Sequence, residues 1–195
     1  MTKHSMKLTL VACALALVTS FGSHSAQAQD LFSALFGGGG GFNKGSSNVS
    51  FSKQFRPGTI VVSFGDRRLY YINKRGNAIS YPIAIPKGDA RWSGVSNISQ
   101  KRVNPSWTPT PSMRRENPKL PAYVPGGHPR NPLGNRAMYI GSSLYRIHGT
   151  DAPWTIGQAV SKGCIRMYNS HAQELYNRVR VGEKVIVTWK KFKSA

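Results

Sequence analysis

The chain has 195 residues, with 27 Lys and Arg against 7 Asp and Glu and a formal net charge of +20. This length suits one domain with a real hydrophobic core rather than two. A chain this basic must meet something anionic, but no nucleic-acid-binding motif is present. Composition therefore disfavours a nucleic-acid-binding protein, and leaves anionic polymers and lipid headgroups as partners, with part of the charge simply solvated.

Residues 1–28 have the pattern of a signal peptide. Two lysines precede an apolar stretch at 8–18, which is shorter than the roughly 20 residues that span a bilayer. The segment ends in the letters AQA at 26–28, a signal-peptidase pattern. The alternative is a lipoprotein box, LVAC at 10–13, which would lipidate Cys13. Either alternative predicts export to the periplasm or cell envelope, where the carboxylate-rich wall polymer and an anionic membrane surface are the expected contacts.

Cleavage after residue 28 would leave Cys164 as the only cysteine of the mature sequence. Exported proteins use cysteines mainly in disulfide pairs. A single cysteine is therefore buried and inert, paired with another chain, or a working thiol. The surrounding sequence has to decide between these alternatives.

Composition divides the rest of the chain into three segments. A Gly/Ser-rich flexible tether is expected at 29–56, because it contains a run of five glycines at 37–41. A single folded domain is expected at 57–190, followed by a short basic tail at 191–195.

The domain opens with three predicted strands. Runs of β-branched and aromatic residues predict them at 59–64, 68–73 and 78–85, and the turn residues between them predict a β-meander. Residues 86–135 are dense in Pro, Gly and Asn, which predicts long functional loops rather than regular elements.

The second half of the domain carries the one predicted helix. A hairpin is expected at 136–147, and the helix follows at 171–179 from its apolar i, i+3, i+4, i+7 spacing. Ser170 and Gln173 form its expected capping box. With a last strand at 184–189, the prediction is a mainly β domain with one helix packed against it.

Four residues in the second half have the types that acyl transfer by a nucleophile requires. His148 ends a predicted strand, and Cys164 follows between Gly163 and Arg166 in the stretch SKGCIR. A thiol is little ionised at neutral pH, so it needs an imidazole as base and later as acid. Backbone N–H groups beside a glycine can hold an oxyanion, and an arginine can bind a carboxylate. Each residue alone is more often structural, but the combination favours a cysteine nucleophile.

Several short motifs occur here in the order of a known family. They are NPSWTP at 104–109, NPLG at 131–134, YRIHGT at 145–150, IG at 156–157, SKGCIRM at 161–167 and VG at 181–182. From 57 to 187 the sequence resembles the YkuD-type L,D-transpeptidase catalytic domain, and the S-x-G-C-x-R box after I-H-G-T is highly specific. The resemblance implies an L,D-transpeptidase-type β-sandwich with one packed α-helix and long loops over the active site.

The resemblance also implies a reaction. Cys164 would attack the bond between the third residue and the terminal D-alanine of a peptidoglycan tetrapeptide stem and form a thioester. An amine from a second stem, giving a 3→3 crosslink, or from an envelope protein would take the acyl group. Water as acceptor would instead make the enzyme an L,D-carboxypeptidase. No cofactor and no metal are implied.

Roles for other residues follow from the same resemblance. His148 is implied as general base and acid, the Gly149 carbonyl as the group that orients its ring, and Gly163 as part of the oxyanion hole. Substrate binding is implied for Arg166, Ser161, Trp154 and Tyr145. Trp107 is a further candidate to line the donor groove.

Three residues depart from the family pattern or stand apart from it. Lys162 occupies a position where many members have His, and is expected to help hold the cysteine as thiolate. His171 stands near a position where an acidic residue is common, and is expected to be exposed. His128 lies ahead of the NPLG motif, and is expected on a loop surface or in a lid over the site.

Other classes of protein fit less well. A sortase uses His, Cys and Arg in the same chain order, but its T-L-x-T-C box is absent. Papain-like wall peptidases place Cys before His, the reverse of the order here. A non-catalytic module that coats the wall through its charge is the alternative outside enzymes, and it predicts a dispensable Cys164.

Overall fold

The structure is a computed structural model that describes residues 45–192. The predicted signal peptide at 1–28, most of the predicted tether at 29–56 and the end of the predicted tail at 191–195 lie outside the described residues. Among the residues described, no helix is both long enough and apolar enough to cross a membrane.

The described residues form a mainly β fold, which confirms the predicted fold class. The strands are β1 (Ser47–Ser50), β2 (Ile60–Ser63), β3 (Arg68–Lys74), β4 (Asn77–Pro82), β5 (Ile85–Pro86), β6 (Gly94–Val103), β7 (Arg136–Ile140), β8 (Arg146–His148), β9 (Ala159–Ser161), β10 (Ile165–Arg166) and β11 (Lys184–Thr188). The helices are α2 (Pro111–Glu116), α3 (Asn169–Arg178) and the 3₁₀ turns η1 (Gly88–Ala90) and η2 (Pro153–Thr155). One sheet has the order β1-β4-β3-β2-β11-β6-β7-β8-β10, and β5 pairs with β9 separately.

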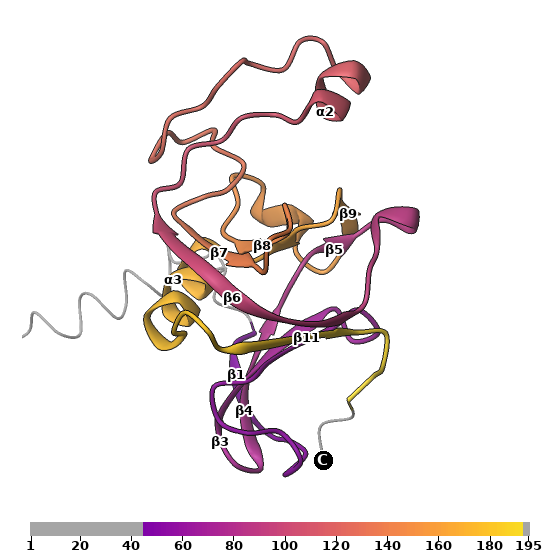
Figure 1. The fold of residues 1–195 in the computed structure, drawn as a ribbon, viewed down its shortest axis with the longest axis vertical. Coiled ribbons are helices and arrows are strands. Elements are labelled where there is room, and N and C mark those ends of the chain that lie inside the picture. Colours follow the sequence, from indigo (N-terminus) through magenta and orange to yellow (C-terminus); the bar gives the residue numbers. More distant parts are fainter. Residues whose placement is uncertain (1–44, 193–195) are drawn as a thin grey trace, which may run out of the picture. The chain divides into compact units, whose positions relative to one another are not determined.

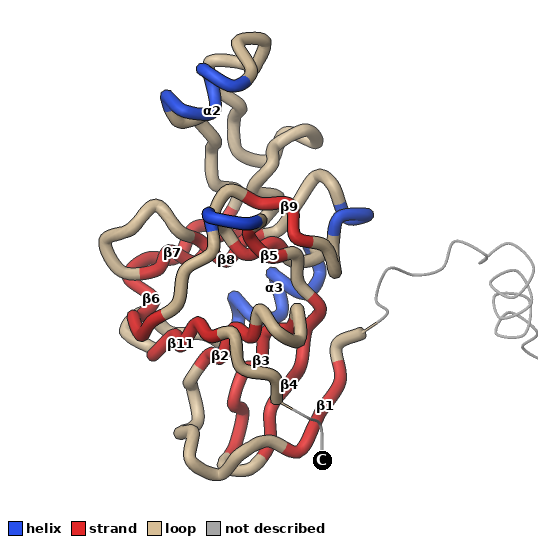
Figure 2. Tube along the Cα trace, turned by 90° about the vertical axis from the view of Figure 1, so that its right-hand side faces the viewer, coloured by secondary structure: helices blue, strands red, loops and turns tan. Residues whose placement is uncertain are grey.

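The first half of the large sheet is the predicted meander. β2, β3 and β4 are antiparallel neighbours, and β11 joins β2 in parallel (Figures 1 and 2). Both faces of this half are covered, so the residues of β2 are all buried. The main core lies on one face, and Phe51, Phe55 and Phe192 pack on the other. A strand buried on both faces has a continuous apolar run, and for this reason the sequence predicted it well.

The last part of the predicted tether belongs to the fold. Residues 47–50 form β1, which pairs antiparallel with the edge of β4. Phe51 then packs on Tyr70, with ring centroids 4.7 Å apart and the ring planes tilted by 35°. Backbone pairing and aromatic burial therefore order a segment that its serines and glycines had assigned to a linker, and the tether prediction is wrong for this part.

Strand β6 joins the two halves of the sheet. Its first residues pair with β11 and its later residues with β7, with a register shift between Ile98 and Gln100. The prediction of irregular loops throughout 86–135 is wrong here. Only Ile98 is buried among the ten residues of β6, so the strand has no apolar alternation that would reveal it in the sequence.

Helix α3 packs against β7 and β8 and completes the main core with Ala172 and Leu175. It begins at Asn169 with Tyr168 as N-cap, so Ser170 lies inside the helix and does not take the predicted cap position. His171 was expected to be exposed but is 2% exposed. Its ring lies against Tyr81 and Tyr168, because the helix starts two residues earlier than predicted and residue 171 lies on its buried face with Ala172 and Leu175.

A long loop between β6 and β7 carries the second helix, α2, which the sequence did not predict. Thr110 caps α2 by accepting a hydrogen bond from the Met113 N–H at 3.3 Å, and Pro111 follows at the first helical position. Figures 1 and 2 both show this loop projecting beyond β7 and β8, on the side away from the meander. The loop is therefore placed to cover the end of the sheet where β8 and β10 lie.

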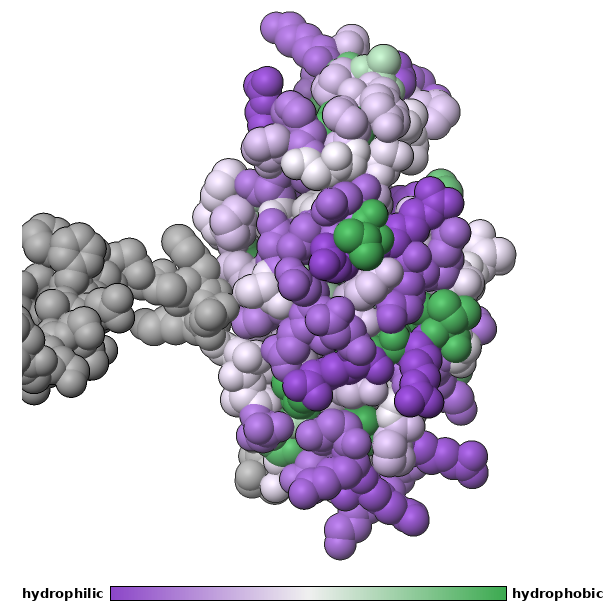
Figure 3. All heavy atoms as spheres, turned by 90° about the vertical axis from the view of Figure 1, so that its left-hand side faces the viewer, coloured by the Kyte–Doolittle hydropathy of each residue, from purple (hydrophilic) through white to green (hydrophobic). Residues whose placement is uncertain are grey.

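The surface reflects the basic composition. Figure 3 shows one face of the molecule on which hydrophilic side chains predominate and apolar ones are scattered in small groups. Isolated apolar residues on a surface need no partner. This face fits a solvated, charged surface.

Candidate active site

Two very short parallel strands, β8 and β10, form the floor of the candidate site. Their register pairs Ile147 with Ile165 and His148 with Arg166. Both isoleucines are fully buried in the main core. Because successive strand residues point to opposite faces, the residues on either side of these isoleucines face away from the core.

The register brings four reactive or charged residues together on that face: Arg146 and His148 from β8, and Cys164 and Arg166 at β10. We refer to them as the quartet. All four line one cavity of about 200 Å³. Sequence analysis had singled out three of them, and the structure adds Arg146.

The ring of His148 is held by a single backbone group. The side chain is 3% exposed, and its Nδ1 lies 2.5 Å from the carbonyl oxygen of Gly149. Since a carbonyl only accepts, Nδ1 carries the proton and Nε2 is the nitrogen left with a free lone pair. Burial lowers the pKa of His148 to about 3, against an ordinary value of 6.5, and the charges of Arg166 and Arg146 act in the same direction. The imidazole is therefore neutral at pH 7 and available as a base.

The Cys164 thiol is half-buried and unpaired. Its sulfur donates to the carbonyl of Leu144 at 3.8 Å. Burial raises the pKa of Cys164, while hydrogen bonding from Arg146 and the charges of Arg146 and Arg166 oppose that effect. The cavity thus holds a neutral thiol and a neutral imidazole, and Arg146 is the neighbour that most favours the thiolate.

The loop from Ser161 to Cys164 has a strained turn at its centre. Gly163 has φ +124°, in the region that favours glycine. A Cβ at this position would lie 2.3 Å from Cε1 of Tyr145, so any side chain would collide with that ring. Ser161, which is 2% exposed, donates from Oγ to the Cys164 carbonyl at 2.5 Å. Two of the residues predicted to bind substrate, Ser161 and Tyr145, therefore support the shape of the cysteine loop.

Asn169 is a second residue that sequence analysis did not select. Its Oδ1 accepts from the Thr150 N–H at 3.0 Å and from the Asn135 N–H at 3.4 Å, and its Nδ2 donates to the Thr150 carbonyl at 3.0 Å. These bonds join the start of α3 to the segment that follows His148. The only sequence signal was an Asn at a helix start, which on its own predicts no tertiary contact.

Helix α2 lies over the quartet's cavity and over a second one. Met113 and Thr110 line both, together with Leu144, Arg146, Lys162 and Cys164. The second cavity has a volume of about 600 Å³. Cys164 is therefore reached from two adjoining spaces under the same loop. Trp107, a predicted groove residue, lines the smaller one.

Other predicted residues lie away from the thiol or have other partners. Trp154 is 71% exposed and does not line the cavity of the quartet. His128 lines a separate cavity of about 530 Å³ beside Trp107. The Lys162 ammonium forms an ion pair with Glu116 of α2. This contact ties α2 to the cysteine loop, and the expectation that Lys162 helps to hold the thiolate stays a prediction.

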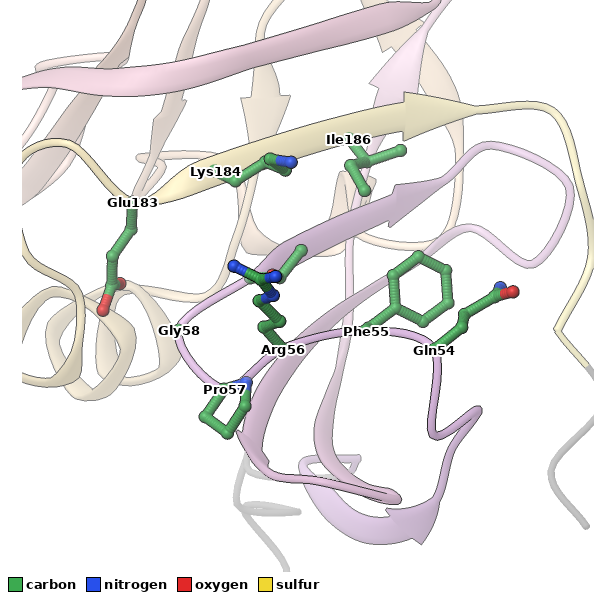
Figure 4. Close-up of a pocket in the computed structure, with 9 residues that line it drawn as sticks. Gln54, Phe55, Arg56, Pro57, Gly58, Glu183, Lys184 and Ile186 are labelled. Carbon is green, nitrogen blue, oxygen red and sulfur yellow. The ribbon is translucent and has the colours of Figure 1, made fainter.

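A larger cavity, of about 680 Å³, is lined by residues 54–59 and the start of β11 (Figure 4). Arg56, Glu183 and Lys184 supply its charged groups, and the described residues around it include no cysteine or histidine. It lacks the groups for nucleophilic chemistry. Within residues 45–192, no three His, Cys, Asp or Glu side chains lie close enough to hold a metal ion.

Comparison with known proteins identifies the family of this domain. Residues 57–187 match the family model of the L,D-transpeptidase catalytic domain, YkuD. The chain therefore belongs to this family, which confirms the resemblance of its motifs.

One relative is the probable L,D-transpeptidase ErfK/SrfK of Escherichia coli strain K12, 44% identical over 133 residues. The match covers 65% of this chain and 42% of that protein, so the chain spans about two fifths of the relative's length.

Two solved structures resemble the fold. The Ldtfm-avibactam carbamoyl enzyme has a TM-score of 0.52 at 20% identity, covering 70% of this chain and 51% of the other, which shows the fold alone. A chain from Brucella melitensis, named a probable carnitine operon oxidoreductase, is 39% identical with a TM-score of 0.50. That match covers 75% of this chain and 94% of the Brucella chain.

Proposed function

We propose that the protein is a peptidoglycan L,D-transpeptidase in which Cys164 forms a thioester with the third residue of a tetrapeptide stem. Membership of the family supports the reaction class. The observation that carries the chemistry is the cavity shared by a thiol and a neutral imidazole, flanked by two arginines. The basic surface suits an acidic wall polymer.

Acylation begins with proton transfer from the Cys164 thiol to Nε2 of His148, the ring nitrogen that the Gly149 carbonyl leaves free. The sulfur adds to the stem carbonyl, and backbone N–H groups of the Gly163–Cys164 turn hold the oxyanion. When the C–N bond breaks, His148 returns the proton to the leaving D-alanine amine. Arg146 lowers the cost of the developing thiolate, because it approaches the sulfur through both its backbone and its side chain.

Deacylation reverses these roles. The acceptor amine gives a proton to His148 and attacks the thioester, and the amide forms as the C–S bond breaks and the thiol is restored. The two adjoining cavities at Cys164 supply separate approaches for donor and acceptor. The acceptor is a second stem or an amine of an envelope protein. Arg166, in register with His148, is the arginine placed to bind a carboxylate of the donor peptide.

Export is part of the proposal, since the substrate is a wall polymer. The lysines, apolar stretch and AQA pattern of residues 1–28 support cleavage and release to the periplasm. Cell fractionation with N-terminal sequencing of the mature protein tests it. A product that keeps residues 1–28 in the cytoplasmic fraction contradicts it.

The decisive experiment is mass spectrometry of the purified protein with tetrapeptide muropeptides, with and without an added amine, beside the Cys164→Ala variant. We expect loss of D-alanine and a new 3→3 dimer or amine adduct from the wild type only. Loss of D-alanine with water as the sole acceptor would make the enzyme a carboxypeptidase. No change in the wild type, with a thiol probe leaving Cys164 unlabelled, would favour the wall-binding module.

A further inference from the structure

Trp92, between η1 and β6, has no role in the mechanism above, yet it contacts the cysteine loop directly. Its indole Nε1 donates to the carbonyl oxygen of Gly163 at 3.1 Å. Its ring stacks on Tyr145 with centroids 4.7 Å apart and planes 7° from parallel. Both rings pack against the main core. The indole is thus fixed on a rigid support with its N–H aimed at one backbone carbonyl.

That carbonyl belongs to the same peptide group as the N–H of Cys164. The group is planar and trans, so its C=O and N–H point in opposite directions. Holding the Gly163 oxygen toward Trp92 therefore sets the direction of the Cys164 N–H. In the described part of the chain, no backbone carbonyl accepts a hydrogen bond from this N–H.

The next carbonyl is held in a similar way. Ser161 donates to the Cys164 oxygen, so side-chain donors engage the carbonyls on both sides of the nucleophile. The positive φ of Gly163 permits the turn, and the Tyr145 ring occupies the space that a Cβ would need. Because both carbonyls accept hydrogen bonds from side chains, the backbone group at Cys164 that is left without a partner among the described residues is its N–H. An N–H is a donor, which is what an oxyanion requires.

We propose that Trp92 is a positioning residue: its indole N–H fixes the Gly163–Cys164 peptide so that the Cys164 N–H is directed at the oxyanion formed during acyl transfer. The inference rests on the proposed function, since only carbonyl addition creates an oxyanion. Preorganised donors stabilise such a charge because they need no reorientation during the reaction. Trp92 acts through the peptide and does not contact the substrate.

Two reactions of the Cys164 thiol distinguish a positioning role of Trp92 from a purely structural one. Iodoacetamide forms an S–C bond at a saturated carbon and expels iodide, so no oxyanion arises. A carbapenem is attacked at its lactam carbonyl; an S–acyl bond forms, the C–N bond breaks and the ring nitrogen takes a proton. Both rates are read on the intact protein by mass spectrometry.

The test variant is Trp92→Phe, which keeps an aromatic ring on Tyr145 but removes the donor. We expect the carbapenem acylation rate to fall about 10- to 100-fold, less than the roughly 10²–10³ lost when an oxyanion donor is itself removed. Alkylation by iodoacetamide stays unchanged. Trp189→Phe, the same substitution at a half-exposed residue beside Phe64, changes neither rate.

If Trp92→Phe fails to fold, as judged by circular dichroism, the indole is replaced by benzothiophene, which keeps the bicyclic shape without an N–H. An equal fall in both rates would overturn the proposal, since the thiol itself would then be perturbed. Unchanged acylation would overturn it as well. A wild-type protein that is alkylated but never acylated would overturn the proposed function, and the role of Trp92 with it.

Discussion

The two halves of the large sheet are built in different ways. In the meander, strands of four to seven residues pair along long ladders with one register shift, between Ile72 and Lys74, and the core covers one face of them while aromatic residues cover the other. In the half that carries the quartet, β8 has three residues and β10 has two. Side chains such as Trp92, Ser161 and Asn169 hold the backbone there.

The difference shows how one small domain separates stability from reactivity. In a strand that is paired on both sides along its whole length, every backbone N–H and C=O is hydrogen-bonded, and none is left for a substrate. Short strands leave backbone groups free, but something else must then fix their direction. Substitutions in the meander should therefore change stability, and substitutions around the quartet should change rate.

The largest effect is expected at the nucleophile. Cys164→Ala should reduce turnover of tetrapeptide stems by at least about a thousandfold, on the scale seen when a nucleophile is removed. The melting temperature should change little, because the thiol is small and the hydrogen bond that it donates, to the Leu144 carbonyl at 3.8 Å, is weak. Residual activity above one part in about a thousand, measured by muropeptide mass spectrometry, would rule out Cys164 as nucleophile.

His148→Ala should lower the turnover rate by about 10²- to 10⁴-fold through loss of the general base. His128→Ala serves as the matched control, since His128 lines a separate cavity. A loss smaller than about tenfold for His148→Ala would mean that another group takes the proton.

A substitution in the meander should change the stability of the fold and leave the reactivity of Cys164 unchanged. Leu69 is fully buried in β3, and Leu69→Ala should lower the free energy of unfolding by about 2–5 kcal/mol. Alkylation of Cys164 in the folded variant should keep the wild-type rate. Denaturant unfolding and iodoacetamide kinetics measure the two quantities. A changed alkylation rate would show that the halves are coupled.

Acid should weaken the fold through two buried histidines, His148 of the quartet and His171 of α3. The pKa values of His148 and His171 are both lowered by burial, that of His148 to about 3. Their stabilising contribution is complete above an ordinary His pKa near 6.5 and is lost as the pH falls toward the folded-state values. His148 should add about 1.4 kcal/mol per pH unit to the slope of the unfolding free energy below pH 6, and His171 should add to that slope in the same direction. His171→Leu should therefore make the slope smaller in urea unfolding between pH 6 and 5, and an unchanged slope would contradict this.

The sequence predicted those parts of the fold whose burial leaves a pattern. The continuous apolar run of β2 and the helical spacing of α3 are two such patterns, and both elements were predicted, although the helix begins two residues earlier than expected. Strand β6 has no such pattern in the sequence, because nine of its ten residues are not buried. Strand β1 has none either, because its order comes from pairing with β4 across about thirty residues of chain.

The candidate site shows the same limit. Motif and residue type selected Cys164 and His148, and the structure places both in one cavity. Arg146 was missed because an arginine in a strand is ordinarily a surface charge, and only the register of β8 with β10 brings it beside the thiol. Trp92 was missed because its partner is 71 residues away in the chain. Trp154 was selected by type, but the structure leaves it exposed.

The carbonyl that orients His148 has a consequence for any genetic study of this site. Whatever residue occupies position 149, the same backbone oxygen remains, and a Cβ there would in addition lie 2.0 Å from Oδ1 of Asn169. On the proposed mechanism, an alanine scan would thus count two essential side chains, those of Cys164 and His148, where three groups act, and would record position 149 only as a packing defect. Exchanging the amide between residues 149 and 150 for an ester would weaken that oxygen as an acceptor and leave every side chain unchanged, although it would also remove the Thr150 N–H that donates to Asn169. The Gly149 carbonyl can therefore be altered by chemical synthesis but not by a change of codon.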